Sequence, residues 1–174
     1  MGGERTFSLD RLLASMPQRG RVEWIGLRPA RREPLQPVGS AQATPGQGLA
    51  GDRFRGTAQS KRQVTLIQDE HLAAVAAMLG RGRIEPGEVR RNIVVAGINL
   101  YALRHATFRV GDVLLEGTGI CAPCARMEEA LGPGGFNAMR GHGGITARVL
   151  QAGRVSVGDP VEVNEPGVLG TDEL

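Results

Sequence analysis

The chain has 174 residues, of which 41% are hydrophobic and only 3% are aromatic. This length allows one domain with a proper core, which must be built from Val, Ile, Leu and Ala. The 21 basic and 18 acidic residues give a formal net charge of +3, a balance that does not support a nucleic-acid partner. Lys61 is the only lysine, so we expect no pyridoxal phosphate (PLP) on this chain itself.

The first half of the chain predicts an N-terminal extension and then strands separated by loops. In FSLDRLLASM at 7–16, apolar residues recur at helical spacing behind Ser8, an expected N-cap, and this helix belongs to an extension over 1–20. The other expected elements are strands at 22–29, 62–68 and 92–97, a helix at 69–79 capped by Asp69, and Pro/Gly-rich loops at 31–56 and 80–91.

The segment that follows predicts a strand pair and then a helix. TFRVGDVLLEGTG at 107–119 indicates two antiparallel strands that turn at Gly111 and Asp112. ARMEEAL at 125–131 indicates a helix, and GPGGFNAMRGHGGI at 132–145 indicates a third glycine-rich loop.

The last part of the chain predicts a hairpin and a tail. The strands ARVLQ at 147–151 and RVSVG at 154–158 flank an expected turn at Ala152 and Gly153, and the tail covers 164–174. The chain as a whole contains no repeated βαβ pattern. We therefore expect a mainly β fold, a closed or nearly closed barrel with two or three short helices.

Both cysteines lie in one stretch, GTGICAPCARMEEALG at 117–132, where an expected strand ends and an expected helix begins. The N–H groups at the start of a helix stabilise a thiolate and can lower its pKa below the usual ~8.5. Arg126 adds positive charge, and Pro123 fixes the backbone between the two sulfurs. This arrangement suits a reactive or metal-ligating thiolate.

The cysteine turn alone leaves its role open. A structural zinc site needs further ligands, and the remaining candidates are three scattered histidines, which do not favour it. A thioredoxin-like dithiol fits CAPC, but that motif follows the first strand of a βαβ unit, whereas the segment before Cys121 is expected to be antiparallel. Two partly buried small hydrophobic residues explain the local sequence equally well.

No apolar run approaches the roughly 20 residues that a membrane helix needs. The amino terminus also lacks the apolar segment of a signal peptide. With two cysteines so close together and no export signal, we expect a cytoplasmic protein in a reducing compartment, with no membrane partner.

Four blocks carry a resemblance that extends beyond the cysteine turn. They are LAGDRFRG at 49–56, KRQVTLIQDEH at 61–71, a long segment at 89–128 that ends in CAPCARME, and GHGGITARVLQAGRVSVGDPVEV at 141–163. In this order and spacing they resemble a MOSC domain, the domain named for the carboxy-terminal part of molybdenum cofactor sulfurase. The resemblance covers residues 22–163. It implies a β-rich, barrel-like fold that binds molybdenum cofactor or carries sulfur on one cysteine.

The resemblance also implies roles for single residues. Cys124 in PCARM matches the functional cysteine, as thiolate and molybdenum ligand, whereas Cys121 matches a variable position and is given at most an accessory role. The implied cofactor-binding residues come from a basic-x-Asn segment, a Gly-Asp turn, a glycine-rich loop and the segment after the cysteine: Arg90, Arg91, Asn92, Asp52, Gly141, His142, Gly143 and Arg126. A plain tight turn explains the glycine-rich loop nearly as well as a phosphate cradle does.

One departure from the relatives affects the expected pocket. Many relatives have a histidine shortly after the Gly-Asp turn, where this chain has Phe54 and Arg55. The sequence therefore does not define which polar residues line the pocket at this position.

By this resemblance, our leading hypothesis is reduction of N-hydroxylated compounds at a molybdenum centre ligated by Cys124. Electrons would come from a separate reductase, because the chain has no flavin, nicotinamide or iron–sulfur motif. The first alternative is a sulfur carrier that receives persulfide sulfur on Cys124 from a separate, PLP-dependent cysteine desulfurase and serves metal–sulfur centre formation. The second alternative is a non-catalytic module that only binds the cofactor.

Overall fold

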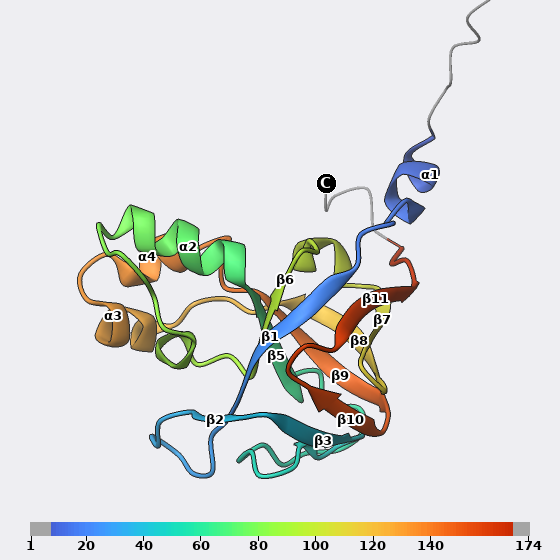
Figure 1. Ribbon diagram of the computed structural model, residues 1–174, viewed down its shortest axis with the longest axis horizontal. Coiled ribbons are helices and arrows are strands. Elements are labelled where there is room, and N and C mark those ends of the chain that lie inside the picture. The colour runs from blue at the N-terminus through green and yellow to red at the C-terminus, as the bar shows by residue number, and fades with distance from the viewer. Residues whose placement is uncertain (1–7, 169–174) are drawn as a thin grey trace, which may run out of the picture.

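The computed structural model describes residues 8–168, and in this part of the chain seven strands close into a barrel (Figure 1). The barrel order is β11-β7-β8-β9-β5-β6-β1, and it closes because β1 pairs with β11 as well as with β6. The strands are β1 (Gly20–Leu27), β2 (Gln36–Val38), β3 (Ser40–Thr44), β4 (Gly48–Leu49), β5 (Val64–Gln68), β6 (Ile93–Ala96), β7 (Thr107–Val110), β8 (Val113–Ile120), β9 (Ile145–Gln151), β10 (Gly153–Ser156) and β11 (Pro160–Glu165).

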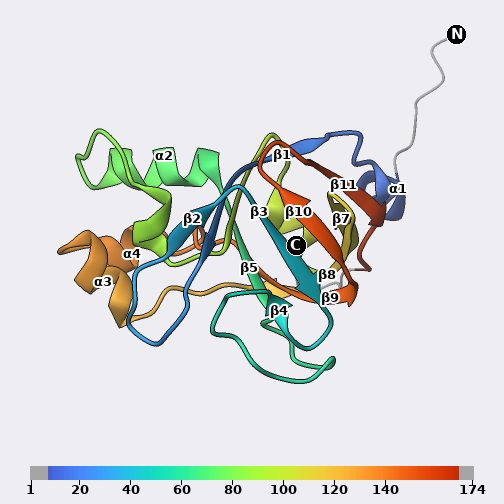
Figure 2. The same cartoon turned by 60° about the horizontal axis from the view of Figure 1, so that its bottom comes forward.

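Neighbouring barrel strands are antiparallel except β5 and β6, which run parallel. Outside the barrel, β2 pairs with the last residues of β1, and β10, β3 and β4 form a second sheet, which Figure 2 brings forward. The helices are α1 (Leu9–Ala14), α2 (Asp69–Met78), the 3-10 helices η1 (Pro86–Val89) and η2 (Leu100–Leu103), α3 (Ala125–Leu131) and α4 (Gly135–Met139). The mainly β, barrel-like fold expected from the sequence is confirmed.

The barrel interior is filled mostly by aliphatic side chains, as the low aromatic content requires. Alternate residues of β8 and β7 point inward, and Phe108 is the bulkiest side chain among the fully buried ones. Ala41, Ala43 and Leu49 from the second sheet belong to the same core. The second sheet therefore packs against the barrel as part of one hydrophobic unit.

A second hydrophobic core lies between the barrel and the helices α2, α3 and α4, which cover one side of it in Figure 1. Ile67 of β5 and Val94 of β6 point outward from the barrel into this core. They pack with Val75 of α2, Met127 of α3 and Met139 of α4. This contact fixes α3, and with it the cysteine turn, against the outer face of β5 and β6.

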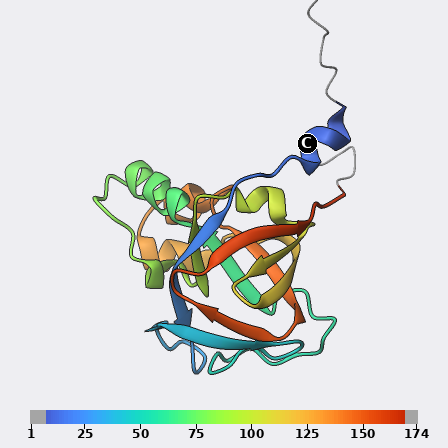
Figure 3. The same cartoon turned by 45° about the vertical axis from the view of Figure 1, so that its right-hand side comes forward.

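The helix expected near the amino terminus is present as α1, which stands clear of the barrel (Figure 3). Ser8 is its N-cap, and the Ser8 hydroxyl accepts a hydrogen bond from the backbone N–H of Arg11 at 3.4 Å. No residue of α1 is buried. Parts of the expected extension and tail, residues 1–7 and 169–174, lie outside the described residues. Within 8–168, every helix is too short or too polar to cross a membrane.

The expected Pro/Gly-rich loop at 31–56 is the largest correction to the predicted elements, because it contains β2, β3 and β4. The sequence SAQAT of β3 has small and polar residues with weak strand propensity. Its strand conformation comes from pairing with β10, with Ala43 opposite Gly153 and Ala41 opposite Val155. Tertiary pairing thus overrides the local preference.

The hairpin expected at 147–158 is also wrong, because β9 and β10 belong to different sheets. β9 pairs with β8 and β5, whereas β10 pairs with β3. The chain changes sheet at Ala152, and Gly153 lies so close to the Asp112 backbone that a Cβ at Gly153 would lie 2.6 Å from the Asp112 carbonyl oxygen. Contact with the β7–β8 turn therefore replaces the expected hairpin turn.

Two smaller corrections concern helices. The glycine-rich loop expected at 132–145 contains α4, whose Ala138 and Met139 are buried in the second core, so burial stabilises a helix that local composition disfavours. Asp69 was expected as the cap of α2 but is its first residue; Gln68 holds the N-cap position without a side-chain bond. The helix expected at 125–131 matches α3.

Candidate functional site

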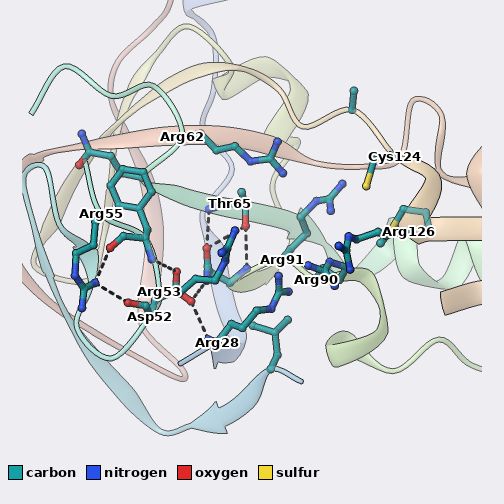
Figure 4. Close-up of a pocket in the computed structure, with 16 residues that line it drawn as sticks. Arg28, Asp52, Arg53, Arg55, Arg62, Thr65, Arg90, Arg91, Cys124 and Arg126 are labelled. Carbon is teal, nitrogen blue, oxygen red and sulfur yellow. Dashed lines mark hydrogen bonds between the residues drawn. The ribbon is translucent and has the colours of Figure 1, made fainter. Parts of the chain in front are cut away.

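A cavity of about 600 Å³ opens between the barrel and the helical layer, a size typical of small-molecule sites (Figure 4). Its walls come from the segment after β1, the loop after β4, the start of β5, the segment before β6, and the cysteine turn with α3. The lining residues are Arg28, Leu35, Asp52, Arg53, Phe54, Arg55, Arg62, Gln63, Thr65, Arg90, Arg91, Asn92, Ala122, Cys124, Arg126 and Met127.

The two cysteines occupy different environments. Cys121 is buried directly after β8, and its backbone N–H donates to the carbonyl of Gly144 at 2.8 Å. Cys124 is exposed, is the N-cap residue of α3, and accepts through its carbonyl a hydrogen bond from Met127 N–H at 2.8 Å. Only the Cys124 thiol belongs to the cavity lining. Both cysteines are free.

Positive charge dominates the cavity, because seven of its lining residues are arginines and one, Asp52, is acidic. Within residues 8–168, none of the ion pairs involves a lining arginine. The Asp52 carboxylate instead accepts from the backbone N–H of Arg28 at 2.8 Å and of Phe54 at 3.4 Å, and from Asn92 Nδ2 at 3.4 Å. The cavity is therefore built to receive an anion.

Burial, and then repulsion from neighbouring guanidinium groups, lower the pKa of Arg28 and of Arg90. Burial lowers the pKa of Arg28, and repulsion from Arg90 lowers it further, against an opposing contribution from Asp52. The pKa of Arg90 is lowered by burial and then by Arg126, while a Cys124 thiolate opposes the shift. An anionic ligand would relieve this repulsion, since opposite charge favours the protonated guanidinium.

Arg91 lines the cavity, but its side chain donates its hydrogen bonds to backbone carbonyls. Its side chain is 3% exposed and donates from Nε to the carbonyl of Gly143 at 2.8 Å, from Nη1 to Val89 at 2.9 Å, and from Nη2 to Cys121 at 3.2 Å. Burial lowers its pKa. Arg91 therefore ties together three separate segments around the cysteine turn.

Asn92 has a similar linking role beside it. Its Oδ1 accepts from the backbone N–H of Thr65 at 3.2 Å and from Thr65 Oγ1 at 3.0 Å. Its Nδ2 donates to the carbonyl of Gly26 at 3.2 Å. Asn92 thus holds β1 and β5 at the rim of the cavity where Asp52 also lies.

The expected phosphate-binding loop, Gly141 to Gly143, does not line the cavity. A Cβ on Gly143 would overlap the carbonyl oxygen of Cys121, so close packing against the cysteine turn requires glycine there. The ring of His142 lies edge-on to that of His71, with centroids 5.1 Å apart. The loop therefore packs against the cysteine turn on the side that faces away from the cavity lining.

The histidine pair predicts a pH dependence of stability. Burial and His142 lower the pKa of His71, and Glu70 opposes them; Nδ1 of His71 is buried without a protein partner among residues 8–168. Because the folded state binds this proton less readily than an unfolded histidine of pKa ~6.5, stability is retained above that pH and falls below it. We expect the free energy of unfolding, measured in denaturant, to fall less between pH 7 and pH 5 for His71→Asn than for the parent. Equal decreases in the two proteins would contradict this.

Sequence reasoning missed Arg28, Arg53 and Arg62, which lie far from the cysteines along the chain. Arg28 directly follows β1, and Arg90 to Asn92 directly precede β6. Because β1 is antiparallel to β6 and β5 is parallel to β6, the end of β1 and the starts of β5 and β6 meet at one rim. Strand pairing brings Arg28 and Arg62 to this rim, and Arg53 reaches it from the loop after β4.

The fold of the chain is similar to that of several solved structures. One is the YUAD protein from Bacillus subtilis, with 20% sequence identity and a TM-score of 0.72 over 84% of this chain and 96% of that chain. YiiM from Geobacillus stearothermophilus has 17% identity and a TM-score of 0.67 over 84% of this chain and 75% of that chain. YiiM from Escherichia coli has 20% identity and a TM-score of 0.65 over 88% of this chain and 74% of that chain. Identities this low show the fold alone. No curated protein sequence matches the chain. The family model of the MOSC domain matches residues 49–162, which is more than half of the chain, and the chain therefore belongs to the MOSC domain family.

Proposed function

We propose that this protein binds molybdenum cofactor in the arginine-lined cavity, with Cys124 as the protein ligand of the molybdenum. The observation that carries the proposal is the position of Cys124, an exposed thiol that lines the same cavity as seven arginines. Membership of the MOSC family supports the choice of this cofactor over other anions, since such domains are associated with it. The proposal places the protein in the cytoplasm, where its thiols stay reduced.

The residues present fit this cofactor. Its molybdenum is held by two dithiolene sulfurs, so the protein needs to supply one soft ligand, and a thiolate meets that need. Among residues 8–168 no group of three or more His, Cys, Asp or Glu side chains could hold a metal ion by itself. A cofactor that carries its own sulfur ligands suits such a site. The cofactor's phosphate would find planar guanidinium partners in the cavity.

The residues of the cavity divide into those that hold the cofactor and those that hold the site. Arg90 and Arg126, which lie next to each other in the lining near Cys124, would bind the phosphate. Arg91 and Asn92 keep the cysteine turn and the strand ends in place through their backbone bonds. Met127, whose side chain is fully buried, would exclude water from the space beside Cys124.

When bound, the cofactor supplies two-electron redox chemistry. The reaction we propose is reduction of an N-hydroxylated compound, in which the N–O bond breaks and the oxygen leaves as water after uptake of two electrons and two protons. The electrons would come from a separate reductase. Guanidinium groups at the cavity would stabilise negative charge that develops on the departing oxygen.

The proposal is tested by production in a host rich in molybdenum cofactor. We expect molybdenum and pterin in near-equal amounts in the purified parent, at least about tenfold less of both in Cys124→Ser, and parent levels in the matched control Cys121→Ala. Loss in both variants would indicate a folding defect, which denaturant unfolding would reveal. A parent without molybdenum and pterin would overturn the proposal.

A sulfur carrier is the second function, and one observation favours it. Cys124 is exposed while Cys121 is 1% exposed, so a single thiol is open to a protein-sized donor. The Cys124 thiolate would attack the outer sulfur of the persulfide on a cysteine desulfurase, which releases the donor's thiolate and leaves a persulfide on Cys124. After incubation with a desulfurase and cysteine, the mass of the parent should increase by one sulfur atom and that of Cys124→Ser should not. An unchanged parent would exclude this function.

A further inference from the structure

The lining arginines differ in how far the protein already uses them. Arg55 donates from Nη1 to the carbonyls of Asp52 at 2.8 Å and Phe54 at 2.6 Å, and Figure 4 shows it directed to the Asp52 side of the cavity. Arg62 donates from Nη2 to the sulfur of Cys121 at 3.4 Å. Together with Arg91, these side chains are occupied within the protein. The side chains of the other four lining arginines make no hydrogen bond to residues 8–168: Arg28, Arg53, Arg90 and Arg126.

The charge of the cavity exceeds what one cofactor phosphate neutralises. The lining carries seven arginines and Asp52, a formal charge of +6. A phosphate monoester contributes about −1.5 to −2 near pH 7, and a Cys124 thiolate one further negative charge. About three positive charges would remain in a partly buried space, where unpaired charge is costly. The excess calls for a second anionic group.

Arg28 marks where this second group would bind. Its side chain is nine-tenths buried and lines the cavity, and its Nε is buried without an acceptor among residues 8–168. A buried N–H of this kind costs free energy unless a partner satisfies it. In Figure 4 the side chain of Arg28 begins beside Asp52 and extends toward Arg90, and Arg53 lies next to Asp52. The charged groups that act most strongly on Arg28 are Arg90 and Asp52, followed by Arg53 and Arg126.

We propose that Arg28 and Arg53 form a second anion site, which binds a phosphate group beyond that of the cofactor. This inference rests on the proposed function, because it takes the phosphate near Cys124 to belong to molybdenum cofactor. Two forked guanidinium groups match the oxygens of a phosphate better than those of a carboxylate, since they supply more donors than two oxygens use. The bound molecule is therefore a phosphorylated substrate, or a cofactor extended by a nucleotide. The N-hydroxylated compound of the proposed reaction would carry a phosphate ester.

The test is binding to the cofactor-loaded protein. By calorimetry, we expect adenosine 5′-monophosphate to bind at least about tenfold more tightly than adenosine, and Arg28→Met to remove that difference. Arg55→Met is the matched control, because its guanidinium is bound to backbone carbonyls, and it should keep the preference. Equal binding of nucleotide and nucleoside by a parent that carries the unextended cofactor would overturn the inference.

Two further measurements separate the sources of the phosphate. The molybdenum content of Arg28→Met should equal that of the parent; a loss as large as that of Cys124→Ser would assign Arg28 to the cofactor's own phosphate and overturn the second site. If cofactor released from the parent carries a nucleotide, and that from Arg28→Met does not, the site stands and the cofactor fills it.

Failure of the proposed function is distinguishable from failure of this site. If the parent contains no molybdenum, the nucleotide is titrated into the cofactor-free chain. The second site then predicts that Arg28→Met weakens binding about tenfold, while Arg55→Met, whose guanidinium is bound to backbone carbonyls, changes it by less than about twofold. Equal weakening by the two variants would contradict it.

Discussion

Replacement of Arg91 by Met is expected to lower the free energy of unfolding by about 3 kcal/mol, because it removes charged donors from three buried or partly buried carbonyls. Those carbonyls belong to Val89, Gly143 and Cys121, in three different segments. Met fills much of the space of the arginine stem but offers no donor. Denaturant unfolding, with the midpoint and slope compared with those of the parent, measures the loss.

Arg90→Met is the matched control for this prediction. Arg90 neighbours Arg91 in sequence, but its side chain is half-buried, makes no hydrogen bond to residues 8–168 and is repelled by Arg126. Its backbone φ is 62°, and arginine and methionine meet the same strain there. We expect a change within about 0.5 kcal/mol. Similar losses in both variants would show that Arg91 does not act through its backbone bonds.

The same substitution should also affect Cys124, which Arg91 does not contact through a hydrogen bond. Arg91 Nη2 bonds the carbonyl of Cys121, three residues before Cys124 in the turn. With that bond lost, the turn has more freedom, and the rate at which an alkylating reagent modifies Cys124 should differ from that of the parent while Arg91→Met is still folded. An unchanged rate would limit the role of Arg91 to stability. A changed rate would identify Arg91 as a positioning residue for Cys124.

What the sequence predicted depended on whether the relevant residues are contiguous. Cys124 and the helix after it form one short stretch, so strand end, turn and helix start could be recognised together, and α3 was expected at its observed bounds. Asp52 and Asn92 were also expected near the site, and they do line one cavity. The cysteine turn follows from a local pattern, whereas Asp52 and Asn92 were expected from the family resemblance.

The rest of the site depends on strand pairing that local patterns do not encode. Arg28 and Arg62 join the cavity only because the end of β1 and the start of β5 lie at one rim. β3 pairs with the two-residue strand β4 and, along most of its length, with β10, which lies more than a hundred residues later. A weak strand former such as SAQAT gains its conformation from that partner, so a single-sequence pattern indicates a loop. The number of arginines in the cavity was beyond prediction for the same reason.

Gly144→Ala should have the largest effect of any single substitution proposed for this chain, because two costs combine at one position. Gly144 has a φ of +82°, and a Cβ there would overlap the carbonyl oxygen of Leu66 in β5. That oxygen is backbone and cannot move without distortion of the barrel. Gly144 also accepts the hydrogen bond from Cys121 N–H at 2.8 Å. We expect a loss of about 4 kcal/mol or more in the free energy of unfolding.

Gly141→Ala separates the two costs. Gly141 has a similar φ of +77°, but nothing lies within 4 Å of an added Cβ. Only the left-handed conformation is penalised, at about 1–2 kcal/mol. The difference between the free energies of unfolding of the two variants, measured in denaturant, therefore gives the cost of the overlap between the added Cβ and β5. Equal decreases in the free energy of unfolding would mean that β5 shifts to make room for the added Cβ. A much larger decrease for Gly144→Ala would identify this contact as the one that fixes the cysteine turn on the barrel.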